Sequence, residues 1–154
     1  MKRYILLDNI RSLHNVGSIF RTADGSWFDM IYLTGYTPTP PRKEISKTAL
    51  DAENSVPWEF YKDPTEIIQL LQWQWVKILC IEQDRNSKSI ENIKIHKNDS
   101  ICYIVWNEKT WVSKSLLNIA DVIIELPMLG IKQSLNVSVT AGIIMYIDML
   151  YKRI

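Results

Sequence analysis

Short apolar runs alternate with longer amphipathic stretches along this chain. Runs of four to six mostly apolar residues are continuous rather than alternating, which predicts strands buried on both faces of a sheet. The predicted strands are Tyr4–Leu7, Met30–Leu33, Val76–Ile81, Ile101–Val105 and Val122–Leu126. The stretches between them have helical periodicity, at about 15–25, 44–53, 64–74, 113–119 and 134–152. Strands that alternate with helices predict an α/β fold with a mainly parallel sheet and helices on both faces.

The length and composition fit one globular domain. The chain has 154 residues, of which 47% are hydrophobic and 23% are charged, and its one loop-like cluster, Thr37–Arg42, is too short to divide domains. No apolar run approaches the ~20 residues of a membrane span, and the apolar stretch at the N-terminus is too short for a secretory signal. We therefore expect a cytoplasmic protein without a membrane partner.

Charge and motif content exclude several function classes. A net charge of +1 provides no broad basic field, so a nucleic-acid partner would need a local basic patch. The chain lacks the glycine-rich dinucleotide fingerprint, the phosphate loop and the nucleophile elbow. Cys80 and Cys102 lie inside apolar runs and are expected to be buried thiols, and no cysteine or histidine spacing predicts a metal site.

Polar side chains gather in three segments that follow predicted strands, at 9–24, 105–113 and 126–142. In the first segment, Asn15 lies at a predicted helix start and Arg21 lies nearly two turns further along. In the third, Ser134 can cap a long helix whose first turns contain Asn136, where unpaired N–H groups favour ligand binding. Taken alone, the same residues also fit a capped helix with a solvated arginine, and Glu108 fits a solvent-facing carboxylate.

The chain contains four motifs in a fixed order: Asn15-x5-Arg21, Asn107-Glu108, Leu126-Pro-Met128 and Ser134-Leu-Asn-Val-Ser138. This order resembles one known family, the SpoU (TrmH-like) branch of the SPOUT RNA methyltransferases. The resemblance covers nearly the whole chain, and its last motif is highly specific. It implies a C-terminal deep trefoil knot in an α/β domain that forms a homodimer. Relatives often have an extra N-terminal RNA-binding domain, but this chain begins directly at its first predicted strand, so we expect one domain over residues 1–154 without that extension. Knots are exceptions to normal chain threading, so composition could not indicate one.

The resemblance also implies a reaction, the transfer of a methyl group from S-adenosylmethionine to a ribose 2′-hydroxyl of tRNA or rRNA without a metal. It assigns cofactor contacts to Ile81, Trp106, Leu126, Met128 and Leu135. It assigns catalytic roles to Arg21, Asn15, Glu108, Ser134 and Asn136. A free guanidinium is a poor base, so Arg21 is implied either as the base or as a clamp on the RNA phosphate. Hydrogen bonds from Asn15, Asn136 and Ser134 would orient Arg21 and the ribose. Glu108 would hold its own loop in place or pair with Arg21.

The RNA is not specified by the sequence. To bind the RNA, the chain would need cationic side chains near the active site, although a solvated surface explains the same residues equally well. The candidates for phosphate contacts are Lys2, Arg3, Arg11, Arg42 and Lys43.

The chain departs from the family at its tryptophans. Trp106 and Trp111 stand where the second motif has glycine, and Trp27 stands at a third glycine position. Trp73 and Trp75 are further candidates, and 6 Trp against 5 Gly is an unusual balance. One hypothesis is that these five positions are UGA codons read as glycine in the source organism, since UGA is one base from the glycine codon GGA.

The other hypothesis is a diverged protein, a non-catalytic RNA-binding dimer whose cofactor loop is blocked by Trp106 and Trp111. Glycine near a ligand permits close backbone approach, and an indole there takes up space that the ligand needs. Under either hypothesis we expect the double substitution of both residues by glycine to strengthen cofactor binding.

Overall fold

The strands and helices follow one another in the alternation that the apolar pattern predicts. The computed structural model describes residues 1–96, 98–106 and 114–152. The strands are β1 (Arg3–Asp8), β2 (Met30–Thr34), β3 (Trp58–Tyr61), β4 (Val76–Ile81), β5 (Lys88–Ser89), β6 (Ser100–Trp106) and β7 (Val122–Glu125). The helices are α1 (Leu13–Ser26), α2 (Lys43–Ala49), α3 (Ala52–Ser55), α4 (Pro64–Trp73), α5 (Lys114–Ile119) and α6 (Val137–Lys152), with a short 3-10 turn at Ile90–Asn92.

The strands form one sheet in the order β3-β2-β1-β6-β4-β7-β5, and every neighbouring pair is parallel. Because all strands run in the same direction, their carboxyl ends meet at one edge of the sheet. The register places Asp8, the last residue of β1, opposite Trp106, the last residue of β6. Ligands of open parallel sheets bind outside this carboxyl edge, and the loops that follow β4 and β7 lie there.

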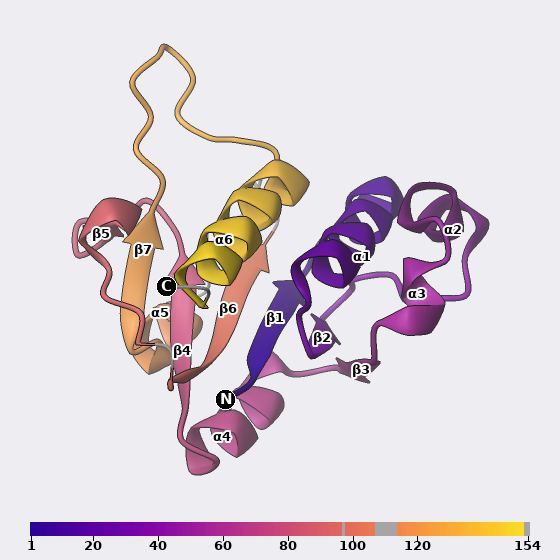
Figure 1. Ribbon diagram of the computed structural model, residues 1–154, viewed down its shortest axis with the longest axis horizontal. Coiled ribbons are helices and arrows are strands. Elements are labelled where there is room, and N and C mark those ends of the chain that lie inside the picture. The colour runs from indigo at the N-terminus through magenta and orange to yellow at the C-terminus, as the bar shows by residue number, and fades with distance from the viewer. Residues whose placement is uncertain (97, 107–113, 153–154) are drawn as a thin grey trace.

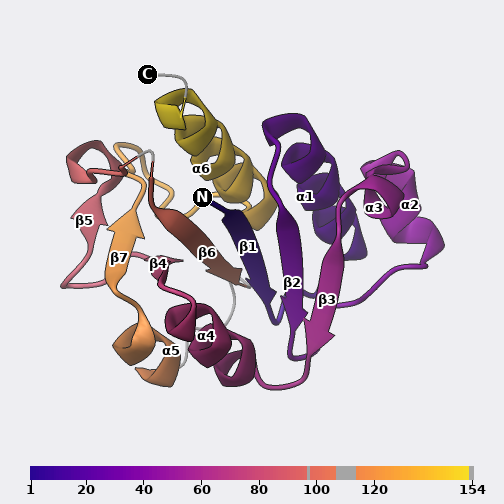
Figure 2. The same cartoon turned by 60° about the horizontal axis from the view of Figure 1, so that its bottom comes forward.

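Helices cover both faces of the sheet, as predicted (Figures 1 and 2). One buried cluster joins the sheet to α1, α2, α3 and α6 through side chains such as Phe20, Ile45 and Met145. A second cluster joins the other face to α4 and α5 through Ile68 and Leu116. That residues 1–154 form a single domain, and that the chain is knotted near its C-terminus, remain predictions.

The five predicted strands are confirmed to within one residue at each end. The prediction missed β3 and the two-residue β5, and the helix expected over 44–53 is two helices. The break falls at Leu50 and Asp51, whose φ angles are 51° and 77°. A second correction concerns α6, which begins at Val137. The Oδ1 atom of Asn136 accepts a hydrogen bond from the N–H of Ser138 at 2.9 Å, so Asn136 caps the helix and the expectation for Ser134 is wrong.

A buried ion pair ties the first strand to the last helix. The Nε of Arg3 donates to the carboxylate of Asp148 at 2.7 Å, and the hydroxyl of Tyr103 donates to the same carboxylate at 2.9 Å. All three residues are fully buried, and burial together with Asp148 raises the pKa of Tyr103. Arg3 therefore cannot contact RNA, which corrects the expectation of a phosphate contact. Lys2 lies at the same amino edge of the sheet, where its Nζ pairs with Asp29 at 2.8 Å.

The two cysteines are free and buried, as expected. Burial raises the pKa of the Cys80 thiol to about 12, so this thiol is not a nucleophile at neutral pH. Among the described residues, no group of three or more His, Cys, Asp and Glu side chains could hold a metal ion. No helix in the described part of the chain is long and apolar enough to cross a membrane.

Candidate functional site

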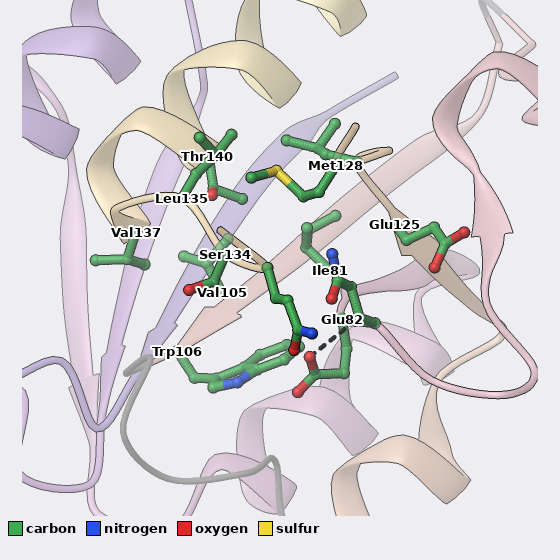
Figure 3. A pocket seen from close by; sticks show the side chains of 13 residues that line it. Ile81, Glu82, Val105, Trp106, Glu125, Met128, Ser134, Leu135, Val137 and Thr140 are labelled. Atoms are coloured by element: carbon green, nitrogen blue, oxygen red, sulfur yellow. Dashed lines mark hydrogen bonds between the residues drawn. The ribbon is translucent and has the colours of Figure 1, made fainter. Parts of the chain in front are cut away.

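A cavity of about 350 Å³ lies at the carboxyl edge of the sheet, where β4, β6 and β7 end and α6 begins (Figure 3). Its volume is at the lower end of the range for small-molecule sites. The loop from β7 to α6 extends beyond the sheet before it returns to the helix (Figure 1). The lining residues are Ile81, Glu82, Gln83, Val105, Trp106, Glu125, Leu126, Met128, Gln133, Ser134, Leu135, Val137 and Thr140.

All five residues that the family resemblance assigns to the cofactor line this cavity. Ile81 ends β4, Trp106 ends β6, and Leu126 follows β7 directly, so the parallel sheet alone brings these three together. Met128 comes from the start of the β7–α6 loop and Leu135 from its end beside α6, and both line the cavity (Figure 3). Four of the five side chains are aliphatic or thioether groups, which suit the flat apolar face of a nucleobase.

The charged groups among these lining residues are carboxylates. Glu82 follows β4 directly, and its carboxylate accepts a hydrogen bond from the N–H of Gln83 at 2.8 Å. Glu125 ends β7, and its carboxylate accepts one from the hydroxyl of Ser87 at 2.7 Å. No Lys, Arg or His occurs among the lining residues that the structure describes. A cavity of this composition favours a ligand that carries positive charge.

Trp106 forms one wall of the cavity. Its indole lies along that wall near the side chain of Glu82 (Figure 3), and it packs against the buried cluster that contains α4 and α5. The cavity thus exists with the indole in place, although the indole takes up space that glycine would leave open. Asn107, Glu108 and Trp111, three residues of the predicted second motif, lie outside the described residues.

Asn15 of the first motif and Asn136 of the last motif meet beside the cavity. The Nδ2 of Asn136 donates to the Oδ1 of Asn15 at 3.3 Å, across 121 positions of sequence. Helices α1 and α6 lie side by side and bring these two residues together (Figures 1 and 2). Ser134 lines the cavity two residues before Asn136. The contact between the two amides therefore adjoins the cavity wall.

Arg21 is exposed on α1, six residues beyond Asn15. No hydrogen bond or ion pair joins its guanidinium to another residue in the described part of the chain. The local sequence sets the start of the helix that carries Arg21. The Ser12 hydroxyl caps α1 by accepting a hydrogen bond from the N–H of Asn15 at 3.2 Å. The apolar face of α1, with Val16, Ile19 and Phe20, is fully buried against the sheet. The structure therefore leaves the guanidinium available to a ligand at the surface.

Sequence reasoning missed two polar groups at this edge. Glu82 is one, although its position directly after a buried strand was a usable signal. The other is Asp8, a buried carboxyl at the end of β1. Burial raises the pKa of Asp8, while hydrogen bonds from the Thr34 hydroxyl at 2.8 Å and the Asn9 amide at 3.1 Å lower it. Asp8 therefore holds the start of the β1–α1 loop to β2.

Two of the five tryptophans for which the sequence suggests a glycine position have backbone conformations that favour glycine. Trp27 has φ 61° and Trp75 has φ 60°, both in the left-handed region. Their side chains are 87% and 91% exposed, so neither indole contributes to the core. Trp73 is 89% exposed as well, but it belongs to α4 and its φ is not positive.

Known proteins resemble this chain in sequence over most of its length. A sequence profile described as the SpoU rRNA Methylase family matches residues 2–146. The chain is 29% identical over 143 residues to a tRNA (guanosine(18)-2′-O)-methyltransferase of Aquifex aeolicus, covering 92% of this chain and 66% of that protein. It is 26% identical to a 23S rRNA (guanosine-2′-O-)-methyltransferase of Neisseria meningitidis, covering 92% of this chain and 55% of that protein. The chain thus spans less than two thirds of the length of these relatives.

Solved structures share the fold. The Aquifex aeolicus TrmH/SpoU tRNA modifying enzyme superposes with a TM-score of 0.88 at 25% identity, covering 99% of this chain and 76% of that one. An AdoMet-bound rRNA methyltransferase from Sinorhizobium meliloti superposes with a TM-score of 0.87 at 23% identity, covering 94% of this chain and 54% of that one.

Proposed function

The chain belongs to the SpoU rRNA Methylase family, and from this premise we propose that it transfers a methyl group from S-adenosylmethionine to a ribose 2′-hydroxyl of RNA. The observation that supports this most strongly is the cavity at the carboxyl edge. Its lining includes all five expected cofactor residues, and the contact between Asn15 and Asn136 adjoins it. The relatives named above act on tRNA and rRNA, and we propose one of these as the substrate, in the cytoplasm.

The residues of the cavity fit S-adenosylmethionine in charge and shape. The cofactor carries a positive sulfonium, and the carboxylates of Glu82 and Glu125 are the charged groups among the described lining residues. Leu126, Met128 and Leu135 offer apolar contact to the adenine. When bound, the cofactor supplies an electrophilic methyl group, so the chain needs to supply position and charge stabilisation rather than a metal.

The other predicted residues would handle the RNA. We assign Arg21 to the phosphate or the developing oxyanion of the ribose, because arginine keeps its proton in proteins and is a donor only. Asn15 and Asn136 are joined by a hydrogen bond and would orient the ribose hydroxyl beside the cavity. Ser134, which lines the cavity, would contribute a further hydroxyl at the boundary between cofactor and ribose. Glu108 would steady the loop after β6 or pair with Arg21.

The partner of this chain in solution is proposed to be a second copy. Four apolar residues recur at helical spacing on the exposed side of α6, and two more lie almost fully exposed on the loop before it. An exposed apolar stripe of this kind marks an interaction site in a soluble protein. The residues are Val139, Ile143, Tyr146 and Leu150 on α6, with Leu129 and Ile131 on the loop.

Analytical ultracentrifugation measures the oligomeric state of the chain directly. Ile143→Lys is expected to convert a dimer into a monomer, whereas Leu70→Lys, at an exposed leucine of α4, is a matched control that leaves the dimer intact. A wild-type chain that sediments as a monomer at micromolar concentration would refute the dimer.

The catalytic proposal is tested with methyl-labelled S-adenosylmethionine and unmodified tRNA and rRNA transcripts, followed by nucleoside analysis. We expect label in a 2′-O-methylated nucleoside. Calorimetry with the cofactor alone separates the two classes of function, because a non-catalytic RNA-binding dimer would bind RNA but not the cofactor. Label on a base, or none with any transcript, would refute the proposed reaction.

A further inference from the structure

We propose that Arg11 and Tyr36 form a clamp for one nucleotide of the substrate RNA, an inference that rests on the proposed function. Arg11 belongs to the loop between β1 and α1, and Tyr36 belongs to the loop between β2 and α2. The guanidinium carbon of Arg11 lies 5.7 Å from the centroid of the Tyr36 ring, in cation–π geometry. Both side chains are exposed, with Tyr36 at 51%.

The two loops leave neighbouring strands at the edge of the sheet that holds the cavity. Strands β1 and β2 are parallel neighbours that end side by side (Figure 2). Asp8, directly before the first loop, pairs in register with Trp106, which lines the cavity. RNA whose ribose reaches the cavity therefore extends over these loops when it runs along the edge toward β2.

Hydrogen bonds between the loops hold this pair in place. The Oδ1 of Asn9 accepts from the N–H of Tyr36 at 3.2 Å. The hydroxyl of Thr37 donates to the carbonyl of Leu7 at 2.9 Å and accepts from the N–H of Ile10 at 3.0 Å. A rigid platform of this kind loses little entropy when a ligand binds.

The backbone also fits this close contact between the loops. Gly35 has φ 66°, and a Cβ atom at that position would lie 2.0 Å from the Oδ1 of Asn9. Asn9 itself has φ 53°, a conformation that asparagine adopts more readily than most residues. Each loop therefore has one residue with a left-handed backbone conformation at the point where the two loops meet.

The charge of these loops matches a polyanion. Segments 9–14 and 35–43 contain Arg11, Arg42 and Lys43 and no Asp or Glu, whereas the whole chain has a net charge of only +1. An exposed aromatic ring accepts a stacked base of any sequence, and an arginine beside it can pair with the phosphate. The chemistry therefore favours a nucleotide of single-stranded or unstacked RNA.

The test measures the affinity for an unmodified tRNA transcript over a range of salt concentrations. Tyr36→Ala is expected to weaken binding about tenfold, and Tyr36→Phe to retain it because stacking needs the ring alone. Arg11→Ala is expected to lower the slope of log affinity against log salt by about one. The control is Lys77→Ala, which removes an exposed cation at the amino edge of the sheet and is expected to leave both affinity and slope unchanged.

Cofactor affinity and methyl transfer separate this inference from the proposed function. Calorimetry with S-adenosylmethionine is expected to give the same affinity for wild type and both clamp variants. Wild type that methylates the transcript, together with Tyr36→Ala and Arg11→Ala variants that bind it as wild type does, would overturn the clamp alone. Wild type that neither binds nor methylates RNA would overturn the proposed function and the clamp together. An equal loss in Tyr36→Phe and Tyr36→Ala would also overturn stacking.

Discussion

Replacing Trp27 by glycine is expected to stabilise the fold although it removes a large side chain. Trp27 follows the last residue of α1 as its C-cap, with φ 61° and ψ 48°, and the N–H of Phe28 donates to the carbonyl of Ala23 at 2.9 Å. For a residue with a Cβ atom, this left-handed conformation costs about 1–2 kcal/mol of conformational energy, and for glycine it does not. The greater freedom of glycine in the unfolded chain costs about 0.4–1 kcal/mol. Because the indole is 87% exposed, its removal costs little packing, and the expected net gain is about 0.8 kcal/mol, the difference between the midpoints of the two ranges.

The same argument applies to Trp75, with φ 60° and 91% exposure, and it offers a matched control at Trp73. Trp73 is equally exposed but helical, so Trp73→Gly is expected to destabilise by up to about 1 kcal/mol. Urea unfolding followed by circular dichroism, at one protein concentration, measures all three. A loss at Trp27 and Trp75 as large as at Trp73 would refute the backbone argument. In the gene, UGG codons at positions 27, 106 and 111 would end the glycine hypothesis.

Four further variants test the core and the site. Asp148→Ala leaves the guanidinium of Arg3 buried without its partner and is expected to cost about 3–5 kcal/mol of unfolding free energy; a loss below 1 kcal/mol in urea would contradict this. Glu82→Gln is expected to weaken S-adenosylmethionine several-fold more than the uncharged thioether product in calorimetry, and equal losses would remove its charge from recognition. Arg21→Ala is expected to abolish methyl transfer with cofactor affinity retained, and turnover above about a tenth of wild type, a deficit under ~1.4 kcal/mol, would exclude a catalytic role. Trp106→Gly enlarges the cavity and is expected to tighten the cofactor at least about tenfold, together with Trp111→Gly; unchanged affinity would mean that the cofactor lies clear of the indoles.

Local patterns predicted the central strands because those strands are buried on both faces. Val76–Ile81 was assigned without error, since a continuous apolar run has one natural place in a parallel sheet. The edge strand β3 (Trp58–Tyr61) was missed because its middle residues, Glu59 and Phe60, are exposed. The break at Leu50 was missed because neither Gly nor Pro marks it.

Contacts between distant parts of the chain left no local signal. Arg3 follows Lys2 and resembles a basic surface, yet it is buried because Asp148, 145 positions away, lies beside it in the fold. Glu82 and Trp106 meet at one cavity only because β4 and β6 are neighbours in the sheet. The positions expected to contact the cofactor came from the family motifs, and the carboxyl edge of the sheet explains why such distant motifs line one cavity.

Asn136 shows why the residue type at the start of α6 matters. Its Oδ1 caps the helix by accepting from the N–H of Ser138 at 2.9 Å, and its Nδ2 donates to Asn15 at 3.3 Å. An aspartate would keep the cap but could not donate, and a serine has one short hydroxyl in place of two separate groups. The amide of Asn136 meets both requirements, so this one side chain caps α6 and also links the start of α6 to α1. Arg21 lies on the same helix as Asn15, so it is linked to this contact through α1 without touching Asn136, while the buried Val16, Ile19 and Phe20 hold α1 on the sheet.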